Sequence, residues 1–358
     1  MILLVGLALI GGIIVLANLY QAQQFTNRIA LNGLYIVVSA MTIMMGGLVF
    51  IMATSNNSTL TTPDEASTLA NIPFSTGLAL FIISLILGIF SVALTLSRPL
   101  RVWVQNFIVQ SDGLEKRKHP DSVVHTLAII LMLFASVFTI GNFIIAGGIE
   151  GLAEEIGDIN AIDLWSNFTL YVVLALLGVG IFIRRDLTRT FKRLGFRLPE
   201  NNRYRQWFIN GLKHLIIGAF VGFGMFWVQV GLSIIWQLFA SPETVAAQSA
   251  ASQALFAALS GSLWLGFLVA FTAGVGEELL FRGALQPIFG NIIVSIFFVM
   301  LHSQYILTPA SLIILIVSLV FGFLRSHYTT PAAMMAHFVY NFTPFVIFAL
   351  LSQYGISL

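Results

Sequence analysis

Two adjacent glutamates, Glu277 and Glu278, and an arginine, Arg282, lie at the end of a long apolar stretch of the sequence. Ionisable side chains inside a membrane-spanning helix, or at its edge, are costly and rare, so by default they indicate a functional site. On a helix, Glu278 and Arg282 are i,i+4 neighbours that can form an ion pair, whereas Glu277 is turned about 100° away. The spacing therefore predicts that Arg282 can hold Glu278 while the Glu277 carboxylate stays available.

Three more polar residues occur on later apolar stretches. His302 ends one stretch, and His337 and Asn341 are spaced i,i+4 on another, which places an imidazole and an amide on one helical face. A carboxylate, two imidazoles and a carboxamide can activate water for hydrolysis: Glu or His takes the proton and donors stabilise the oxyanion, with or without a metal ion. Each motif alone also fits a structural ion pair or hydrogen bond, whereas the set indicates a catalytic site.

The composition shows which scaffold must position these residues. Of 358 residues, 58% are hydrophobic and 9% are charged, and the mean hydropathy is +0.93, whereas soluble domains carry about 25% charged residues. Several apolar stretches have the roughly 18 residues or more that a helix needs to cross the hydrocarbon core. We therefore expect an all-α, polytopic transmembrane helical bundle. The absence of cysteine excludes disulfides, thiol nucleophiles and thiolate metal sites.

About ten membrane segments are expected, separated by Pro, Gly, Asn or charged residues that mark the water interface. Their predicted ranges are 2–20, 31–53, 74–96, 123–147, 164–183, 211–238, 253–276, 287–303, 310–325 and 330–352. The segments 287–303 and 310–325 are short and lie beside prolines, so their ends and tilt stay open. A turn is expected after Arg282.

The distribution of basic residues predicts the orientation in the membrane. With the N-terminus outside and ten crossings, all 17 Lys and Arg fall in or beside inside loops, whereas the outside loops 54–73, 148–163 and 239–252 carry acidic residues and no Lys or Arg. This is the asymmetry of the positive-inside rule. We expect both termini outside, basic loops in the cytoplasm and, without a eukaryotic targeting signal, a prokaryotic plasma (inner) membrane. The net charge of +2 gives no reason to expect nucleic acid as a partner.

The longest charged stretch of the chain predicts a boundary between two parts. Residues 1–183 hold hardly any ionisable groups inside their segments, and we interpret them as an accessory transmembrane bundle of about five helices. Residues 184–204 would form a basic cytoplasmic linker, and residues 205–358 the domain that does the chemistry. The role of the first five helices and the oligomeric state stay open.

Three motifs follow one another on the C-terminal segments. They are Glu277-Glu278-x-x-x-Arg282, Phe298-x-x-x-His302 and His337-x-x-x-Asn341. In this order they resemble the CPBP family of intramembrane proteases, which includes the CAAX prenyl endopeptidases and bacterial abortive-infection and bacteriocin-related proteins. The resemblance covers roughly residues 205–350 and implies a C-terminal CPBP-like catalytic bundle. It implies hydrolysis of a peptide bond in a membrane-associated peptide or protein, which in the CAAX branch has a prenylated C-terminus.

The resemblance also implies roles for the site residues. Glu277 would activate the water, and Glu278 and Arg282 would support it. On the last segment, His337 and Asn341 would complete the site or form the oxyanion hole.

The resemblance leaves the cofactor open, because the family is described either as zinc enzymes or as glutamate-dependent proteases without metal. His302 would share in binding the water or a metal ion. If a metal is used, its ligands would be Glu277, His302 and His337, and three ligands with an open position suit catalytic zinc. A zincin-type helix is excluded, because no His-Glu-x-x-His occurs in the chain.

Two functions of other classes remain as alternatives. A membrane scaffold or regulatory protein could keep the fold without hydrolysis and would be indifferent to Glu277→Gln. A proton-coupled transporter could also use acids and histidines within the membrane, and it would show proton- or potential-dependent flux.

Overall fold

The computed structural model describes residues 2–55, 72–109, 121–148, 160–199, 203–242, 245–246, 249, 263–302 and 310–353. This part of the chain consists of helices and their connections, and it has no β-strand, only an isolated bridge between Ile181 and Arg185. The predicted all-α fold class is confirmed.

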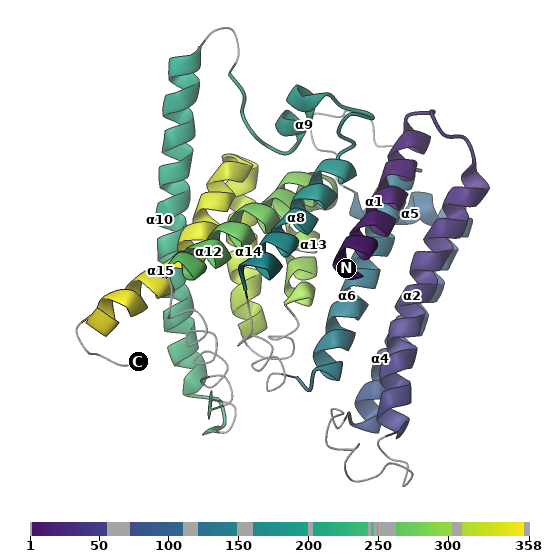
Figure 1. The fold of residues 1–358 in the computed structure, drawn as a ribbon, viewed down its shortest axis with the longest axis horizontal. Coiled ribbons are helices and arrows are strands. Elements are labelled where there is room, and N and C mark those ends of the chain that lie inside the picture. Colours follow the sequence, from purple (N-terminus) through teal and green to yellow (C-terminus); the bar gives the residue numbers. More distant parts are fainter. Residues whose placement is uncertain are drawn as a thin grey trace.

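Figure 1 shows the helices in their chain order, with η1 denoting a π-helix that lies between α12 and α13. The helices are α1 (Ile2–Gln21), α2 (Arg28–Ser55), α4 (Phe74–Leu96), α5 (Arg98–Ile108), α6 (Val123–Ile145), α8 (Ala161–Gly178), α9 (Leu187–Arg193), α10 (Tyr204–Gln237), α12 (Leu263–Glu278), η1 (Leu279–Leu285), α13 (Gln286–Leu301), α14 (Ala310–His327) and α15 (Thr330–Gln353).

Among the described residues, 8 helical runs are long and apolar enough to span a membrane. This confirms the predicted polytopic helical membrane bundle, and the number differs slightly from the predicted number of about ten. In α1 the apolar helix is shorter, Gly6–Gln21, and the predicted segments 253–276 and 287–303 contribute to one run, Leu263–Leu301. The residues after Arg282, where a turn was expected, stay helical in η1, and the kink in the run lies at Gly290 instead. Residues 253–262 lie outside the described residues.

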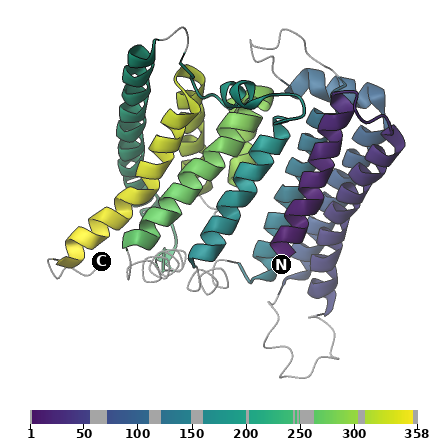
Figure 2. The same cartoon turned by 45° about the horizontal axis from the view of Figure 1, so that its top comes forward.

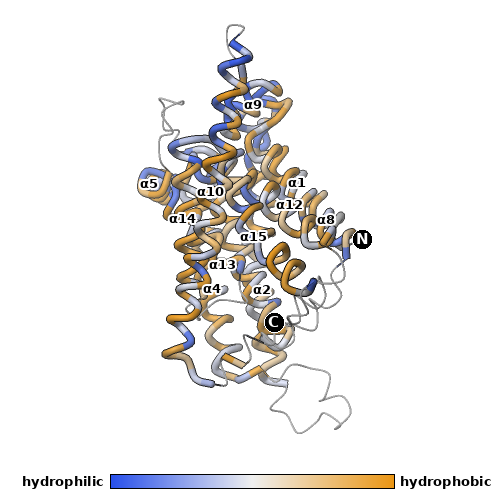
Figure 3. The backbone as a smooth tube through the Cα atoms, turned by 90° about the vertical axis from the view of Figure 1, so that its left-hand side faces the viewer, coloured by the Kyte–Doolittle hydropathy of each residue, from blue (hydrophilic) through white to orange (hydrophobic). Residues whose placement is uncertain are grey.

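Two short helices, α5 and α9, were not predicted. The Ser97 hydroxyl caps α5 by accepting a hydrogen bond from the Leu100 N–H, and the Asp186 carboxylate caps α9 by accepting one from the Arg189 N–H. Such caps satisfy the free N–H groups of a first helical turn. Both helices are too short to span a membrane, and α9 lies within the predicted linker 184–204. In Figure 3, hydrophilic residues gather around α9, whereas hydrophobic residues follow the long helices.

The long helices stand side by side in a row. In Figures 1 and 2, α1, α2, α4 and α6 form one end of the row, α10 and α15 the other, and α8 and α12 lie between them. The most extensive packing joins α2 to α4, α10 to α15 and α12 to α15, and α8 packs on both α12 and η1. The predicted division at 184–204 stays a prediction, but the packing of helices continues across it.

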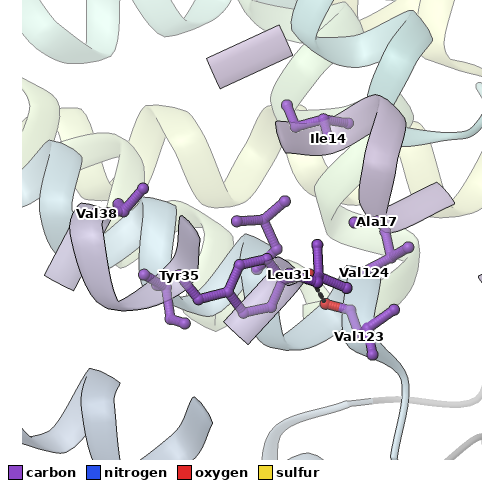
Figure 4. Close-up of a cluster of buried hydrophobic side chains, with 9 residues drawn as sticks. Ile14, Ala17, Leu31, Tyr35, Val38, Val123 and Val124 are labelled. Carbon is purple, nitrogen blue, oxygen red and sulfur yellow. Dashed lines mark hydrogen bonds between the residues drawn. The ribbon is translucent and has the colours of Figure 1, made fainter. Parts of the chain in front are cut away.

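A buried cluster joins α1, α2 and α6 in the first part of the chain. Its members are Ile14, Ala17, Leu31, Tyr35, Val38, Val123, Val124, Leu127 and Ile130. Figure 4 shows the Tyr35 ring among these side chains, with its hydroxyl donating to the Val123 carbonyl at 2.9 Å. The phenol can therefore be buried because its polar end has a partner.

Small residues set the close approach of α10 to α15. A Cβ on Gly218 would lie 2.2 Å from the Ala332 carbonyl oxygen, and one on Gly222 would lie 2.1 Å from the Ala336 carbonyl oxygen. Glycines at i,i+4 allow two membrane helices to pack backbone against backbone. This packing positions α15, which carries His337.

Candidate active site

The helix that carries the two glutamates changes its geometry beside them. α12 ends at Glu278, and η1 continues as a π-helix in which the Gln286 N–H donates to the Phe281 carbonyl. Pro287 follows and has no N–H to donate, and Gly290, at φ +78°, breaks the helix. Single π-helical turns widen a helix and are frequent at functional sites. The sequence thus changes the direction of the chain just after the charged residues.

Glu278 is the centre of a buried network. The Glu278 and Arg282 side chains are both 0% exposed, and Arg282 Nε donates to Glu278 Oε2 at 3.1 Å. The predicted i,i+4 ion pair is therefore present. Glu278 Oε1 accepts a hydrogen bond from His337 Nδ1 at 2.9 Å, and Arg282 Nη2 donates to Ser318 Oγ at 2.7 Å. The network thus joins α12 and η1 to α14 and α15.

Gly274 and Gly276 allow α12 to lie close to its neighbours. A Cβ on Gly274 would be 2.8 Å from the Phe338 backbone nitrogen of α15, and one on Gly276 would be 3.2 Å from the Phe168 ring of α8. The close approach to α15 brings Glu278 within hydrogen-bonding distance of His337.

Glu277 is outside the Glu278 network. Its side chain is half-buried, and Oε2, although buried, has no hydrogen-bond partner among the described residues. The Glu277 carboxylate interacts electrostatically with His337 and with Tyr171 of α8. Burying an oxygen without a partner costs free energy, so the site holds an acceptor that is available to a water or a substrate.

The contact of His337 with Glu278 orients its imidazole. A carboxylate can only accept a hydrogen bond, so Nδ1 of His337 carries the hydrogen and Nε2 of the neutral ring has a free lone pair. His337 was expected as a partner of Glu277, whereas its hydrogen bond in the structure is with Glu278. The reason is that the α12–α15 contact turns Glu278, rather than its neighbour, toward α15.

His302 and His337 lie against the same aromatic ring. The Phe298 ring centroid is 4.4 Å from that of His302 and 6.1 Å from that of His337, and the Arg282 guanidinium lies 5.6 Å from it. His302 Nδ1 donates to the Phe298 carbonyl at 2.8 Å. α13 therefore brings His302 near the network, but His302 forms no hydrogen bond with Glu277 or Glu278.

Asn341 lies one turn after His337 on the continuous helix α15. It is half-buried, and its amide forms no hydrogen bond with the described residues. The amide hydrogens thus stay available as donors on the face of the helix that carries His337.

A zinc site formed by Glu277, His302 and His337 was expected if the protein uses a metal. Among the described residues, no group of three His, Asp or Glu side chains is close enough to hold a metal ion. Nδ1 of His337 donates to Glu278, which leaves Nε2 as the nitrogen that could bind a metal, and the Phe298 ring packs against both histidines. As placed, these three side chains do not form such a group, and the expected zinc site stays a prediction.

Two contributors to the site were missed by sequence reasoning. Ser318 accepts a hydrogen bond from Arg282, which lies 36 positions earlier in the chain. A single serine in an apolar stretch does not indicate such a contact. Phe298 belonged to the motif with His302, which could have directed attention to it, yet it was given no role.

The fold and these groups define a membrane-embedded protein with the components of a hydrolytic site. Residues 259–343 match the family model Rce1-like, described as type II CAAX prenyl endopeptidase Rce1-like. The matched part of the chain contains all the predicted site residues, and the match confirms the resemblance to the CPBP family. Neither the curated proteins nor the solved structures include a match to the chain.

Proposed function

We propose that the protein is an intramembrane endopeptidase in which Glu277 activates the attacking water. The observation that carries the proposal is the different use of the two neighbouring carboxylates. Both oxygens of Glu278 are engaged, by Arg282 and by His337, whereas Oε2 of Glu277 has no partner among the described residues. A general base needs an acceptor that is free to take a proton.

In the proposed reaction, Glu277 takes a proton from water while the water oxygen adds to the carbonyl carbon of the scissile peptide bond. The Asn341 amide can donate to the resulting oxyanion, as such preorganised donors do in other hydrolases. The C–N bond then breaks, and the proton passes to the leaving nitrogen. Nε2 of His337, held in orientation by Glu278, is a second group that can accept and return a proton.

The proposed substrate is a membrane-associated peptide or protein, including one with a lipidated C-terminus. The family description names prenyl endopeptidases, and a site within membrane-spanning helices suits a substrate that reaches it from the bilayer.

The test compares membrane peptides of cells that contain the wild-type protein with those of cells that contain Glu277→Gln. Mass spectrometry should detect new N- and C-termini of one or a few membrane peptides that are present with the wild type and absent with the variant. Equal peptide patterns with the wild type and Glu277→Gln would support a scaffold instead, and flux through liposomes would support a transporter.

A further inference from the structure

We infer that Arg193, Leu194 and Gly195, called here the 193–195 clamp, position the proposed catalytic residues by tying η1 to the beginning of α15. The inference rests on the proposed function. The clamp lies in the stretch that was predicted to be a linker, at the end of α9. In this inference, the three residues of the clamp position the catalytic residues and do not contact the substrate.

The first half of the clamp supports η1. Arg193 Nη1 donates to the Gly283 carbonyl at 3.1 Å, and Nη2 donates to the Ala284 carbonyl at 3.4 Å. Pro287 has no N–H, so it can donate neither to the Gly283 carbonyl in the α-helical register (i+4) nor to the Arg282 carbonyl in the π-helical register (i+5). Arg193 therefore supplies a donor that the helix lacks at this position, and an unsatisfied buried carbonyl would cost free energy.

A second arginine completes this support. Arg325 of α14 donates from Nε to the Arg282 carbonyl at 3.2 Å. Three successive carbonyls of η1, those of residues 282, 283 and 284, thus accept hydrogen bonds from arginine side chains. η1, whose Arg282 holds Glu278 through its guanidinium, is therefore held from both α9 and α14.

The second half of the clamp holds α15. The Leu194 carbonyl accepts from Thr330 Oγ1 at 2.5 Å, and the Gly195 carbonyl accepts from the Thr330 N–H at 3.2 Å. Thr330 is the first residue of α15, and His337 follows two helical turns later, about 10 Å along the axis. Three neighbouring residues therefore contact both η1, which directly follows Glu278, and α15, which carries His337.

Gly195 makes this double contact possible. Its φ is +87°, which favours glycine, and a Cβ would lie 2.5 Å from Arg325 Nε and 2.5 Å from Thr330 Oγ1. With no side chain at this position, Arg325 can pass beside the clamp to reach η1. Leu194 is buried and packs on the other side, with its Cδ2 at 3.1 Å from the position of a Cβ on Gly283.

The test uses full-length protein in proteoliposomes and the peptide that distinguishes wild type from Glu277→Gln. Arg193→Gln should lower kcat on the order of 10- to 100-fold with little change in KM, because small displacements of reacting groups have effects of this size. Arg193→Lys, which keeps the charge and one donor group, should recover part of the loss. Arg189→Gln is the matched control and should resemble wild type, because Arg189 lies on the same helix, exposed, and pairs with Asp186.

A readout without substrate accompanies the kinetics. Hydrogen–deuterium exchange in the peptide covering residues 279–288 should become faster in Arg193→Gln and stay unchanged in Arg189→Gln. If Arg193→Gln does not fold, Thr330→Val, which removes only the hydroxyl contact with Leu194, should show the same pattern more weakly.

The outcomes separate the two proposals. If Arg193→Gln and Thr330→Val match the control in kcat or in exchange, the clamp is overturned while the proposed function stands. If Glu277→Gln still cleaves the peptide, the proposed function fails, and the positioning role fails with it.

Discussion

Glu277 and Glu278 are chain neighbours of the same chemical type, yet their surroundings assign them different tasks. Glu278 is 0% exposed and balances the buried charge of Arg282, whereas Glu277 is half-buried and leaves one oxygen without a protein partner. A buried ion pair is costly to break, because removing one member leaves the other charge uncompensated. We therefore expect a substitution of Glu278 to lower mainly the stability of the fold and a substitution of Glu277 to lower mainly the catalytic rate.

At Glu278, replacement by Ala should lower the free energy of unfolding by roughly 3–5 kcal/mol, because the Arg282 charge would remain buried without its partner. Glu277→Gln should leave it almost unchanged. Thermal unfolding in detergent, followed by circular dichroism, measures both variants. Equal loss of stability in the two would contradict the separation of roles.

His327 has the same local contacts as His302, so comparing the two shows whether His302 has a role in cleavage beyond those contacts. His302 and His327 each donate from Nδ1 to the carbonyl of the phenylalanine four residues earlier, at 2.8 and 3.0 Å, and each packs on that phenylalanine ring. His302→Ala should strongly reduce cleavage, because His302 lies against the Phe298 ring beside the site, and His327→Ala should not. Rates of peptide cleavage by the two purified variants provide the comparison, and similar rates would exclude a role for His302.

At the scale of elements, three helices must meet for the site to exist. α12 with η1 brings the carboxylates and the arginine, α14 brings Ser318, and α15 brings His337. The contact of α15 with α10 through glycines holds this third helix from its other side. The site therefore depends on backbone-to-backbone packing at positions that carry no functional group.

Gly222 and Gly224 on α10 test this dependence. A Cβ on Gly222 would meet the Ala336 carbonyl at 2.1 Å, whereas one on Gly224 meets nothing within 4 Å. Gly222→Ala should lower stability by about 1–3 kcal/mol through overpacking and should reduce cleavage by displacing α15. Gly224→Ala should be neutral or slightly stabilising, because Ala favours the helix. Thermal unfolding and cleavage rates of the pair check the prediction, which fails if both glycines tolerate Ala equally.

The elements and the site differed in how far sequence reasoning could predict them. Long apolar stretches predicted the membrane helices because length and hydropathy are local properties, and the i,i+4 spacing predicted the Glu278–Arg282 pair. The helical continuation after Arg282 was missed, because the carbonyls of η1 find partners in Arg193 and Arg325, far away in the chain. Whether His337 bonds to Glu277 or to Glu278 also depends on how α12 and α15 pack, and the spacing of residues along one helix cannot predict this packing.

For the whole molecule, several elements that carry basic residues lie at the same ends of the long helices, at the top of Figure 1. Figure 1 places α5, α9 and the turn between α1 and α2 at the same end. Arg28, Arg98 and Arg101 surround Asp121, at 4.0, 3.3 and 2.7 Å. This clustering fits the prediction that this end faces the cytoplasm. The helices of the first part pack on those that carry the site, α8 on α12 and η1, and α6 on α13.

The predicted orientation can be measured with single cysteines, because the natural chain has none. A cysteine at Thr188, exposed on α9, should react with an impermeant thiol reagent only after the cells are opened. One at Ala161, exposed at the beginning of α8, should react in intact cells whose outer barrier admits the reagent. The reverse pattern would invert the predicted topology.

The most direct measurement of the central claim is the cleavage rate of purified wild-type protein and Glu277→Gln on the same membrane peptide in proteoliposomes. If Glu277 is the general base, kcat/KM should fall on the order of 10²- to 10⁴-fold, while the unfolding temperature stays near that of the wild type. A Glu277→Gln protein that is equally folded and cleaves at the wild-type rate would contradict the account.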